Sequence, residues 1–181
     1  MKNYEQSCKE YSDIYMHLPV LKQYAEDCET IIEFGLGKTA NAITAFLAAK
    51  PRKVISYDID SMPDVVKEVQ EYADYLKVEW EFRNESTTKT VIEKVDFLFI
   101  DAEHSYQAVA KELQNHHRVN KYIGFHDVIS YASRNENSKD NNIGLIEGIV
   151  PAIFEFLCAN PHWVVDYYSP FNNGLLILKR I

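Results

Sequence analysis

The stretch TIIEFGLG, residues 30–37, decides the fold of this chain. Its apolar and β-branched residues predict a short buried strand over 30–34. Gly35 and Gly37 follow, and glycine lets the backbone turn sharply and lie close to a ligand. A helix is predicted to begin near residue 40, and its unpaired N–H groups and partial positive charge face the turn. The stretch therefore predicts a strand, a turn and a helix with a ligand site at the turn.

A second predicted strand, over 53–57, ends in an acidic residue. This residue, Asp58, follows Gly35 by 23 positions. In nucleotide-binding α/β folds, a carboxylate at this place accepts hydrogen bonds from the two ribose hydroxyls. Gly35, Gly37 and Asp58 together predict a cofactor that contains a nucleoside.

Three kinds of nucleotide site compete for the glycine turn. A P-loop requires a glycine five residues before Gly37, where Ile32 stands, so a P-loop is excluded. A nicotinamide dinucleotide site is matched loosely by Gly35, Gly37 and Ala40, but its pyrophosphate would lie near Glu33 and be repelled. S-adenosylmethionine carries a sulfonium and an ammonium group, which a carboxylate attracts. The turn therefore favours S-adenosylmethionine and leaves the nicotinamide dinucleotide as the alternative.

The composition is that of one globular protein. The 181 residues suit a single domain with a substantial core, and 46% of them are hydrophobic. A net charge of -8 argues against the basic groove of a nucleic-acid-binding protein. No apolar run approaches a membrane span, and the polar, charged N-terminus does not resemble a signal peptide. The three cysteines are widely spaced, as reduced thiols are, so we expect a cytoplasmic protein.

Segments with strand and helix patterns alternate along the chain. The expected strands are 30–34, 53–57, 77–83, 95–100, 122–125, 163–168 and 175–179, and the expected helices are 40–49, 63–75, 86–92, 105–117 and 144–159. This alternation predicts a doubly wound α/β domain with helices on both faces of a mostly parallel sheet. The Asn-Asn-Gly turn at 172–174 joins the last two strands without a helix, so the sheet should end in an antiparallel hairpin.

The chain divides into a short N-terminal segment and one larger domain. Residues 1–28 are expected to form one or two helices, with Pro19 at the start of the second. This segment either packs on the sheet or forms a lid over the cofactor. Residues 29–181 are expected to form the cofactor-binding domain, and the chain to be a single domain overall.

Ionisable residues gather at the carboxyl ends of the expected strands, where open α/β sheets bind ligands. Asp101 and His104 follow the strand over 95–100, and His126 and Asp127 follow the strand over 122–125. The ordinary pKa of histidine lies near neutrality, so His104 is the candidate general base that removes a proton from a hydroxyl nucleophile. Asp101 and Asp127 are the candidate residues that orient the acceptor.

The same edge of the sheet carries a candidate metal site. Its predicted ligands are Asp101, His126 and Asp127. Two carboxylates suit Mg²⁺, and an added imidazole shifts the preference towards Mn²⁺, Fe²⁺ or Zn²⁺. Without a metal, these side chains would orient the hydroxyl groups of a substrate.

Four segments resemble the class I S-adenosylmethionine-dependent methyltransferases: 30–39, 56–60, 96–106 and 124–128. Two of them carry an F-I-D-x-x-H-x-Y strand end and an F-H-D strand end, which are similar to those of the small-molecule O-methyltransferase-like group. Segments elsewhere resemble that group's N-terminal helix, last helix and last strand: 12–21, 148–157 and 172–180. The likeness therefore covers nearly the whole chain.

The resemblance implies a Rossmann-like sheet of seven strands, with the last strand antiparallel. It also implies eight cofactor-binding residues: Glu33, Gly35, Gly37, Asp58, Ile59, Asn84, Ser86 and Asp101. The first three would line the methionine part of the cofactor, and Asp58 would bind the ribose. Ile59 would lie beside the adenine, whose edge would face the loop after the third strand.

The resemblance implies a chemistry as well. Some metal-dependent sugar O-methyltransferases of the wider group use residues like Asp101 and His104, with an acidic pair where this chain has His126 and Asp127. His126 thus departs from the Mg²⁺-binding pattern. We expect an enzyme, as a monomer or homo-oligomer, that methylates a hydroxyl of a sugar or secondary metabolite. Part of the group resembles cephalosporin hydroxylase and not a methyltransferase, so the fold does not settle the reaction. The alternatives are a nicotinamide-dependent oxidoreductase and a nucleoside-binding protein of the same fold without turnover.

Overall fold

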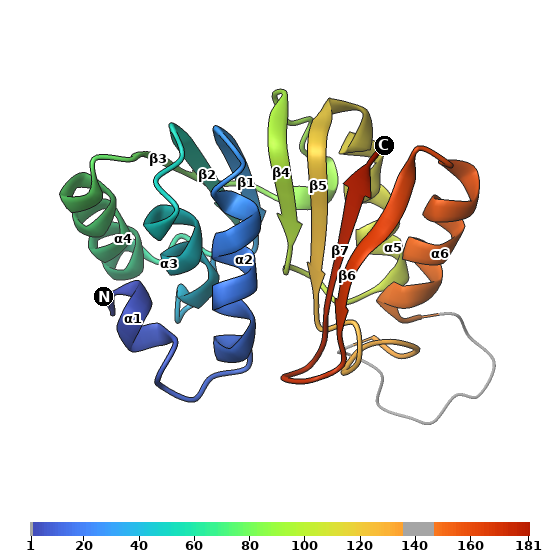
Figure 1. Cartoon of the computed structure of the whole chain (residues 1–181), viewed down its shortest axis with the longest axis horizontal. Coiled ribbons are helices and arrows are strands. Elements are labelled where there is room, and N and C mark those ends of the chain that lie inside the picture. The colour runs from blue at the N-terminus through green and yellow to red at the C-terminus, as the bar shows by residue number, and fades with distance from the viewer. Residues whose placement is uncertain (1, 136–146) are drawn as a thin grey trace.

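The computed structural model of this chain describes residues 2–135 and 147–181 (Figure 1). Its strands are β1 Thr30–Phe34, β2 Lys53–Asp58, β3 Glu79–Asn84, β4 Val95–Ile100, β5 Val119–His126, β6 Trp163–Ser169 and β7 Leu175–Arg180. In the described residues they form one sheet in the order β3-β2-β1-β4-β5-β7-β6. β7 is antiparallel to both of its neighbours, whereas β1 to β5 are parallel. The predicted seven-stranded Rossmann-like sheet with an antiparallel last strand is therefore confirmed.

Helices cover both faces of this sheet, as predicted. They are α1 Tyr4–Ser7, α2 Leu18–Ala25, α3 Asn41–Ala48, α4 Pro63–Leu76, α5 Tyr106–Glu112 and α6 Ile149–Ala159, with 3₁₀ turns η1 Tyr15–His17, η2 Thr87–Lys89 and η3 Leu113–Arg118. α5 and η3 together make up the helix expected over 105–117. Residues 144–146 of the helix expected over 144–159 lie outside the described residues. Among the described helices, none has the length and apolarity that crossing a bilayer requires.

Several sequence-based elements differ from the structure. The strand expected over 122–125 is longer, Val119–His126, and α6 begins only at Ile149. The helix expected over 86–92 is only the short η2 turn, because β-branched residues at 87, 88, 90 and 91 restrain a helix and the Asn115 side chain bonds the backbone of Thr90 and Ile92. The strand expected from residue 77 begins at Glu79. Lys77 instead ends α4 in the left-handed conformation, with φ 61°.

Each face of the sheet has its own hydrophobic core. α2, α3 and α4 pack on one face, where Phe97 and Phe99 of β4 lie fully buried. α5 and α6 pack on the other face, where Leu98 and Ile100 of the same strand lie. The apolar run over 97–100 suits this position, because each fully buried large side chain contributes about 1.5–3 kcal/mol. β4 is therefore covered on both faces next to the strand ends that form the candidate site.

The strand order reverses between β1 and β4, which is the place where open α/β sheets bind ligands. Just beyond these two strands, Asp101 N donates to Phe34 O at 2.9 Å. Gly35 N donates to Tyr57 O, also at 2.9 Å, which joins the end of β1 to β2. The chain segments that leave β1, β2 and β4 are therefore fixed against one another.

The N-terminal segment is tied to the turn between β6 and β7. Asn172 Nδ2 donates to Ser12 O at 2.9 Å, and Met16 N donates to Asn172 Oδ1 at 3.0 Å. His17 Nε2 lies 2.9 Å from Phe171 O. Asn172 and Asn173 both have positive φ, as a tight hairpin turn requires. These bonds hold residues 12–17 beside the end of β5.

Candidate active site

The turn after β1 can be made only with glycine at its first position. Gly35 has φ +90°, and a Cβ there would lie 2.0 Å from Asp101 O. Gly37 has φ +65° but has open space where its Cβ would be. Gly35 is therefore required for the close approach of β1 and β4, whereas Gly37 is favoured only by its backbone conformation.

A cavity of about 480 Å³ lies at the carboxyl ends of β1, β2 and β4. This is within the range of about 300–1,000 Å³ that small-molecule sites occupy. It is lined by six of the eight predicted cofactor residues: Gly35, Gly37, Asp58, Ile59, Ser86 and Asp101. Four further residues that were not predicted also line it: Thr87, Thr88, Ala102 and Glu103. They lie next to Ser86 and Asp101 in the sequence, and this neighbourhood could have indicated them.

Asp58 organises the wall of this cavity. Its Oδ2 accepts a hydrogen bond from Gly37 N at 3.0 Å, and its Oδ1 accepts one from Asp60 N at 2.9 Å. Each carboxylate oxygen has a second lone pair, so both can still accept from a ligand hydroxyl. Asn84 does not line the cavity. Its amide instead donates to the carbonyls of Asp58 and Ile59, at 3.0 and 2.8 Å, and so supports the loop after β2.

Glu33 is fully buried and does not line the cavity. Ser56 Oγ donates to its Oε2 at 2.6 Å, and Trp80 Nε1 donates to Ser56 Oγ at 3.1 Å. Its Oε1 has no hydrogen-bond partner among the described residues. Burial raises the pKa of Glu33 to about 8. A neutral Glu33 attracts a cationic cofactor less than the carboxylate assumed from the sequence, and its role in binding stays a prediction.

The buried carboxyl of Glu33 should make stability depend on pH. Its pKa is higher in the folded chain than the usual 4.5, so it adds stability that is complete below pH 4.5 and lost as the pH rises through about 8. Glu33→Gln cannot ionise at this position. We therefore expect its free energy of unfolding to fall over this pH window by a few kcal/mol less than that of the wild type. Urea unfolding at a series of pH values measures this. Parallel profiles for Glu33→Gln and the wild type would contradict it, and Glu29→Gln, an exposed change, is the control.

Four ionisable side chains from the ends of β4 and β5 meet beside the cavity. His104 Nε2 lies 3.1 Å from Asp127 Oδ2 and 3.5 Å from Asp101 Oδ1. His126 Nδ1 lies 3.2 Å from the same Asp101 oxygen. The structure thus brings together Asp101, His104, His126 and Asp127, hereafter the acid–imidazole cluster. Asp101 belongs both to this cluster and to the cavity wall.

Both ring nitrogens of His126 face oxygen acceptors. Nδ1 faces Asp101, and Nε2 lies 3.1 Å from Asp13 O and 3.3 Å from Asn172 O. Carboxylate and carbonyl oxygens only accept, so the ring donates from both nitrogens and is an imidazolium. Burial lowers the pKa of His126, but Asp101 and Asp127 outweigh burial and raise it to about 9. Nothing in the sequence pattern pointed to Asp13 or Asn172 as its partners.

His104 is also held in its charged form. Burial lowers its pKa, but hydrogen bonds to Asp101 and Asp127 outweigh burial and raise it to about 11. Its ring stacks on Tyr131, with centroids 4.6 Å apart. Burial raises the pKa of Asp101, but the two imidazoliums outweigh burial and lower it. Two carboxylates and two imidazoliums balance in charge, so His104 must lose a proton before it can act as a base.

The described residues contain one group that could hold a metal ion. The candidate ligand atoms of Asp101, His104 and Asp127 lie within 4.8 Å of one another. The metal ligands predicted from the sequence were Asp101, His126 and Asp127, so His104 takes the place of His126 in this group. Asp127 has φ 60°, which is strained for a residue other than glycine, and its Oδ1 is buried without a partner among the described residues. An unpaired buried oxygen of this kind fits a carboxylate that binds a cation or a ligand.

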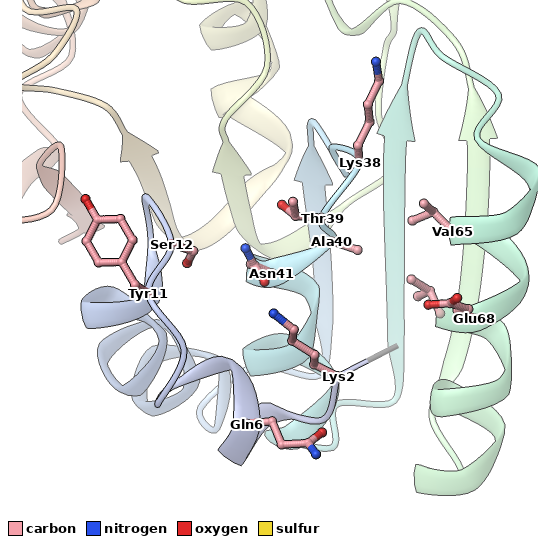
Figure 2. A pocket seen from close by; sticks show the side chains of 11 residues that line it. Lys2, Gln6, Tyr11, Ser12, Lys38, Thr39, Ala40, Asn41, Val65 and Glu68 are labelled. Atoms are coloured by element: carbon pink, nitrogen blue, oxygen red, sulfur yellow. The ribbon is translucent and has the colours of Figure 1, made fainter.

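A second cavity, of about 600 Å³, was not expected from the sequence. Figure 2 shows Lys2 and Gln6 at the N-terminal end, Asn41 at the start of α3, and Val65 and Glu68 on α4 around it. The acid–imidazole cluster does not line it. The smaller cavity, which Asp101 and the glycine turn line, is therefore the candidate cofactor site.

No protein-family model and no curated protein matches this chain. Solved structures do match. An O-methyltransferase from Bacillus cereus in complex with SAH is 16% identical, with a TM-score of 0.68 over 98% of this chain and 90% of that one. An O-methyltransferase from Streptomyces achromogenes involved in tomaymycin synthesis, in complex with SAM, is 13% identical, with a TM-score of 0.65 over 98% and 87%.

A third similar structure is that of an enzyme named for methylation of a nitrogen and not of an oxygen. It is the 1,6-didemethyltoxoflavin-N1-methyltransferase from Burkholderia thailandensis with bound 1,6-didemethyltoxoflavin and S-adenosylhomocysteine. It is 13% identical, with a TM-score of 0.65 over 95% of this chain and 80% of that one. At such identities the comparison establishes the fold. The resemblance predicted from the sequence is confirmed at that level: the chain has the fold of the class I S-adenosylmethionine-dependent methyltransferases.

Proposed function

We propose that this protein is an S-adenosylmethionine-dependent methyltransferase that methylates a hydroxyl group of a small molecule, a sugar or a secondary metabolite. The observation that carries the proposal is the double position of Asp101. It lines the cavity that Gly35, Gly37 and Asp58 shape, and it contacts both histidines of the acid–imidazole cluster. A nucleoside cofactor in this cavity would have groups for proton transfer beside it.

Each part of the site has a distinct task in this proposal. S-adenosylmethionine, when bound, supplies the methyl group to be transferred. Asp58 accepts hydrogen bonds from the ribose hydroxyls, and the glycine turn lets the backbone lie against the cofactor. Asp101 and Asp127 orient the acceptor hydroxyl, and His104 accepts the hydroxyl proton after its own proton has left to water. Transfer then depends mainly on holding the acceptor in line with the methyl group.

A divalent cation would change the protonation of the cluster. Asp101, His104 and Asp127 would be its ligands, and the unpartnered Asp127 oxygen is the observation that fits it. His104 binds a metal only when neutral, so metal binding would release its proton and would be stronger at higher pH. The cation would supply Lewis-acid stabilisation of the acceptor oxygen. His126, whose two ring nitrogens face oxygen acceptors, would stay an imidazolium beside this group.

Two other functions remain as alternatives, and the fold weighs against one of them. Dinucleotide-binding sheets have the parallel strand order 3-2-1-4-5-6, whereas here the antiparallel β7 lies between β5 and β6. The other alternative is a nucleoside-binding protein without turnover. An assay of S-adenosylhomocysteine formation with a panel of sugars and phenolic metabolites separates them. The proposal expects acceptor-dependent product, and cofactor binding with no product from any acceptor would favour the non-catalytic alternative.

Loss of His104 should affect turnover and not cofactor binding. We expect His104→Ala to lower kcat by about 100-fold or more, because general base catalysis contributes about 10²–10⁴. Calorimetry should show an affinity for S-adenosylhomocysteine within about twofold of the wild type, since the cavity wall does not include His104. His117→Ala, a change of an exposed histidine, is the control. Full activity of His104→Ala would remove His104 as the base.

A further inference from the structure

The segment between β3 and β4, residues 85–94, lines the cofactor cavity, and its regular structure is limited to the short η2 turn. Ser86, Thr87 and Thr88 belong to the cavity wall. Ser86 Oγ and Thr88 Oγ1 are hydrogen-bonded to each other at 3.1 Å. Something outside the segment must therefore fix its position, and α5 with η3 provides it.

Two buried polar side chains, one turn apart, hold this segment. Glu112 is fully buried and Asn115 is 4% exposed. Thr87 Oγ1 donates to Glu112 Oε1 at 2.5 Å. Asn115 pairs with the backbone on both sides: its Oδ1 accepts from Ile92 N and its Nδ2 donates to Thr90 O, each at 3.1 Å. Three hydrogen bonds from one helical segment thus fix residues 87–92.

The buried state of Glu112 is costly unless it serves this contact. Its Oε2 has no hydrogen-bond partner among the described residues, and burial raises the pKa of Glu112 to about 7. Leucine would fill a core position between α5 and the sheet without this cost. The carboxyl group is therefore best explained by the Thr87 hydroxyl, from which it accepts a hydrogen bond that holds the Thr87 part of the cavity wall in place.

The position of this wall indicates what it contacts. Asp101 lies at the reaction end of the cavity, and Asp58 lies at the ribose position of the proposed cofactor. The base of a nucleoside extends from the ribose away from the reacting group. The remaining lining on the β2–β3 side consists of Ile59 and residues 86–88, so these residues face the base.

We propose that Glu112 and Asn115 are positioning residues for nucleobase selection: they fix residues 87–92, and with them the part of the cavity wall at residues 86–88, which carries three hydroxyl groups. This inference rests on the proposed function. Hydroxyls both donate and accept, so the choice between an amino-purine and an oxo-purine depends on how rigidly they are oriented. A site built to pair with a polar group discriminates strongly against an analogue that cannot pair.

The test measures nucleobase selection and not affinity alone. The probes are S-adenosylhomocysteine and S-inosylhomocysteine, which differ in the purine edge, and the readout is the ratio of their dissociation constants by calorimetry. We expect the wild type to prefer adenine by about tenfold or more. Thr87→Val, which removes only the hydroxyl, should bring the ratio close to one, and Asn115→Asp should do the same because it sets a carboxylate oxygen against Thr90 O.

Conservative and distant changes serve as controls. Thr87→Ser and Glu112→Gln keep the donor and the acceptor, so both should retain the wild-type ratio. Thr30→Val removes a threonine hydroxyl that accepts from Asp96 N at the amino end of β1, away from the cavity. This variant should also retain the wild-type ratio. A folded Thr87→Val with the wild-type ratio overturns this inference alone. A wild type that binds neither nucleoside overturns the proposed function and this inference with it.

Discussion

Replacing Gly35 with alanine is expected to abolish cofactor binding and to lower the free energy of unfolding by about 3 kcal/mol or more. The new Cβ would lie 2.0 Å from Asp101 O and 2.6 Å from Asp101 C, and both are backbone atoms that cannot move alone. The φ of +90° adds strain for any residue with a side chain. Relief requires the ends of β1 and β4 to separate, which would distort the cavity and the acid–imidazole cluster together. Urea unfolding and calorimetry with S-adenosylhomocysteine measure both effects.

Gly37→Ala is the matched control for this prediction. The same substitution two residues on meets nothing within 4 Å, so only the φ of +65° opposes it. We expect the free energy of unfolding to fall by only about 1–2 kcal/mol. Equal effects of the two substitutions would show that the contact of Gly35 with Asp101 does not limit the fold or the site.

Replacing Asp58 with alanine should lower the affinity for S-adenosylhomocysteine by about 100-fold. A hydrogen bond to a charged group contributes about 1.5–3 kcal/mol, and the ribose offers two hydroxyls. The change also removes the acceptor of Gly37 N, which ties the glycine turn to β2. Asp58→Asn keeps one acceptor oxygen and should give a smaller loss.

Asp60→Ala is the control for charge, because Asp60 is exposed and contacts Asp58 only through its backbone N–H. Its affinity for S-adenosylhomocysteine should stay within about twofold of the wild type. Calorimetry on folded protein, with thermal unfolding as the check, measures all three variants. Unchanged affinity of Asp58→Ala would reject the ribose role of Asp58.

The fold could be predicted where local pattern and tertiary structure agree. The alternation of strand and helix patterns indicated the doubly wound sheet, and the Asn-Asn-Gly turn indicated the terminal hairpin. The helix expected over 86–92 failed because its backbone is bonded by Asn115, 23 residues beyond Ile92. No periodicity within the segment reports a contact of that kind.

The site could be predicted in its composition but not in its electrostatics. Strand ends showed that Asp101, His104, His126 and Asp127 would meet. They did not show that His126 donates from both nitrogens, because Asp13 and Asn172 are brought to it only by the N-terminal segment and the terminal hairpin. The burial of Glu33 was likewise hidden, since an acidic residue before a glycine turn resembles an exposed ligand.

We propose that the cavity between Gly35, Asp58 and Asp101 binds S-adenosylmethionine. Isothermal calorimetry of S-adenosylmethionine and S-adenosylhomocysteine, each with and without Mg²⁺ or Mn²⁺, measures this binding. We expect micromolar dissociation constants for both ligands, and any metal dependence would arise at Asp101, His104 and Asp127. If neither ligand binds under any of these conditions, the proposed function is wrong, and binding of NAD in their place would establish the nicotinamide alternative.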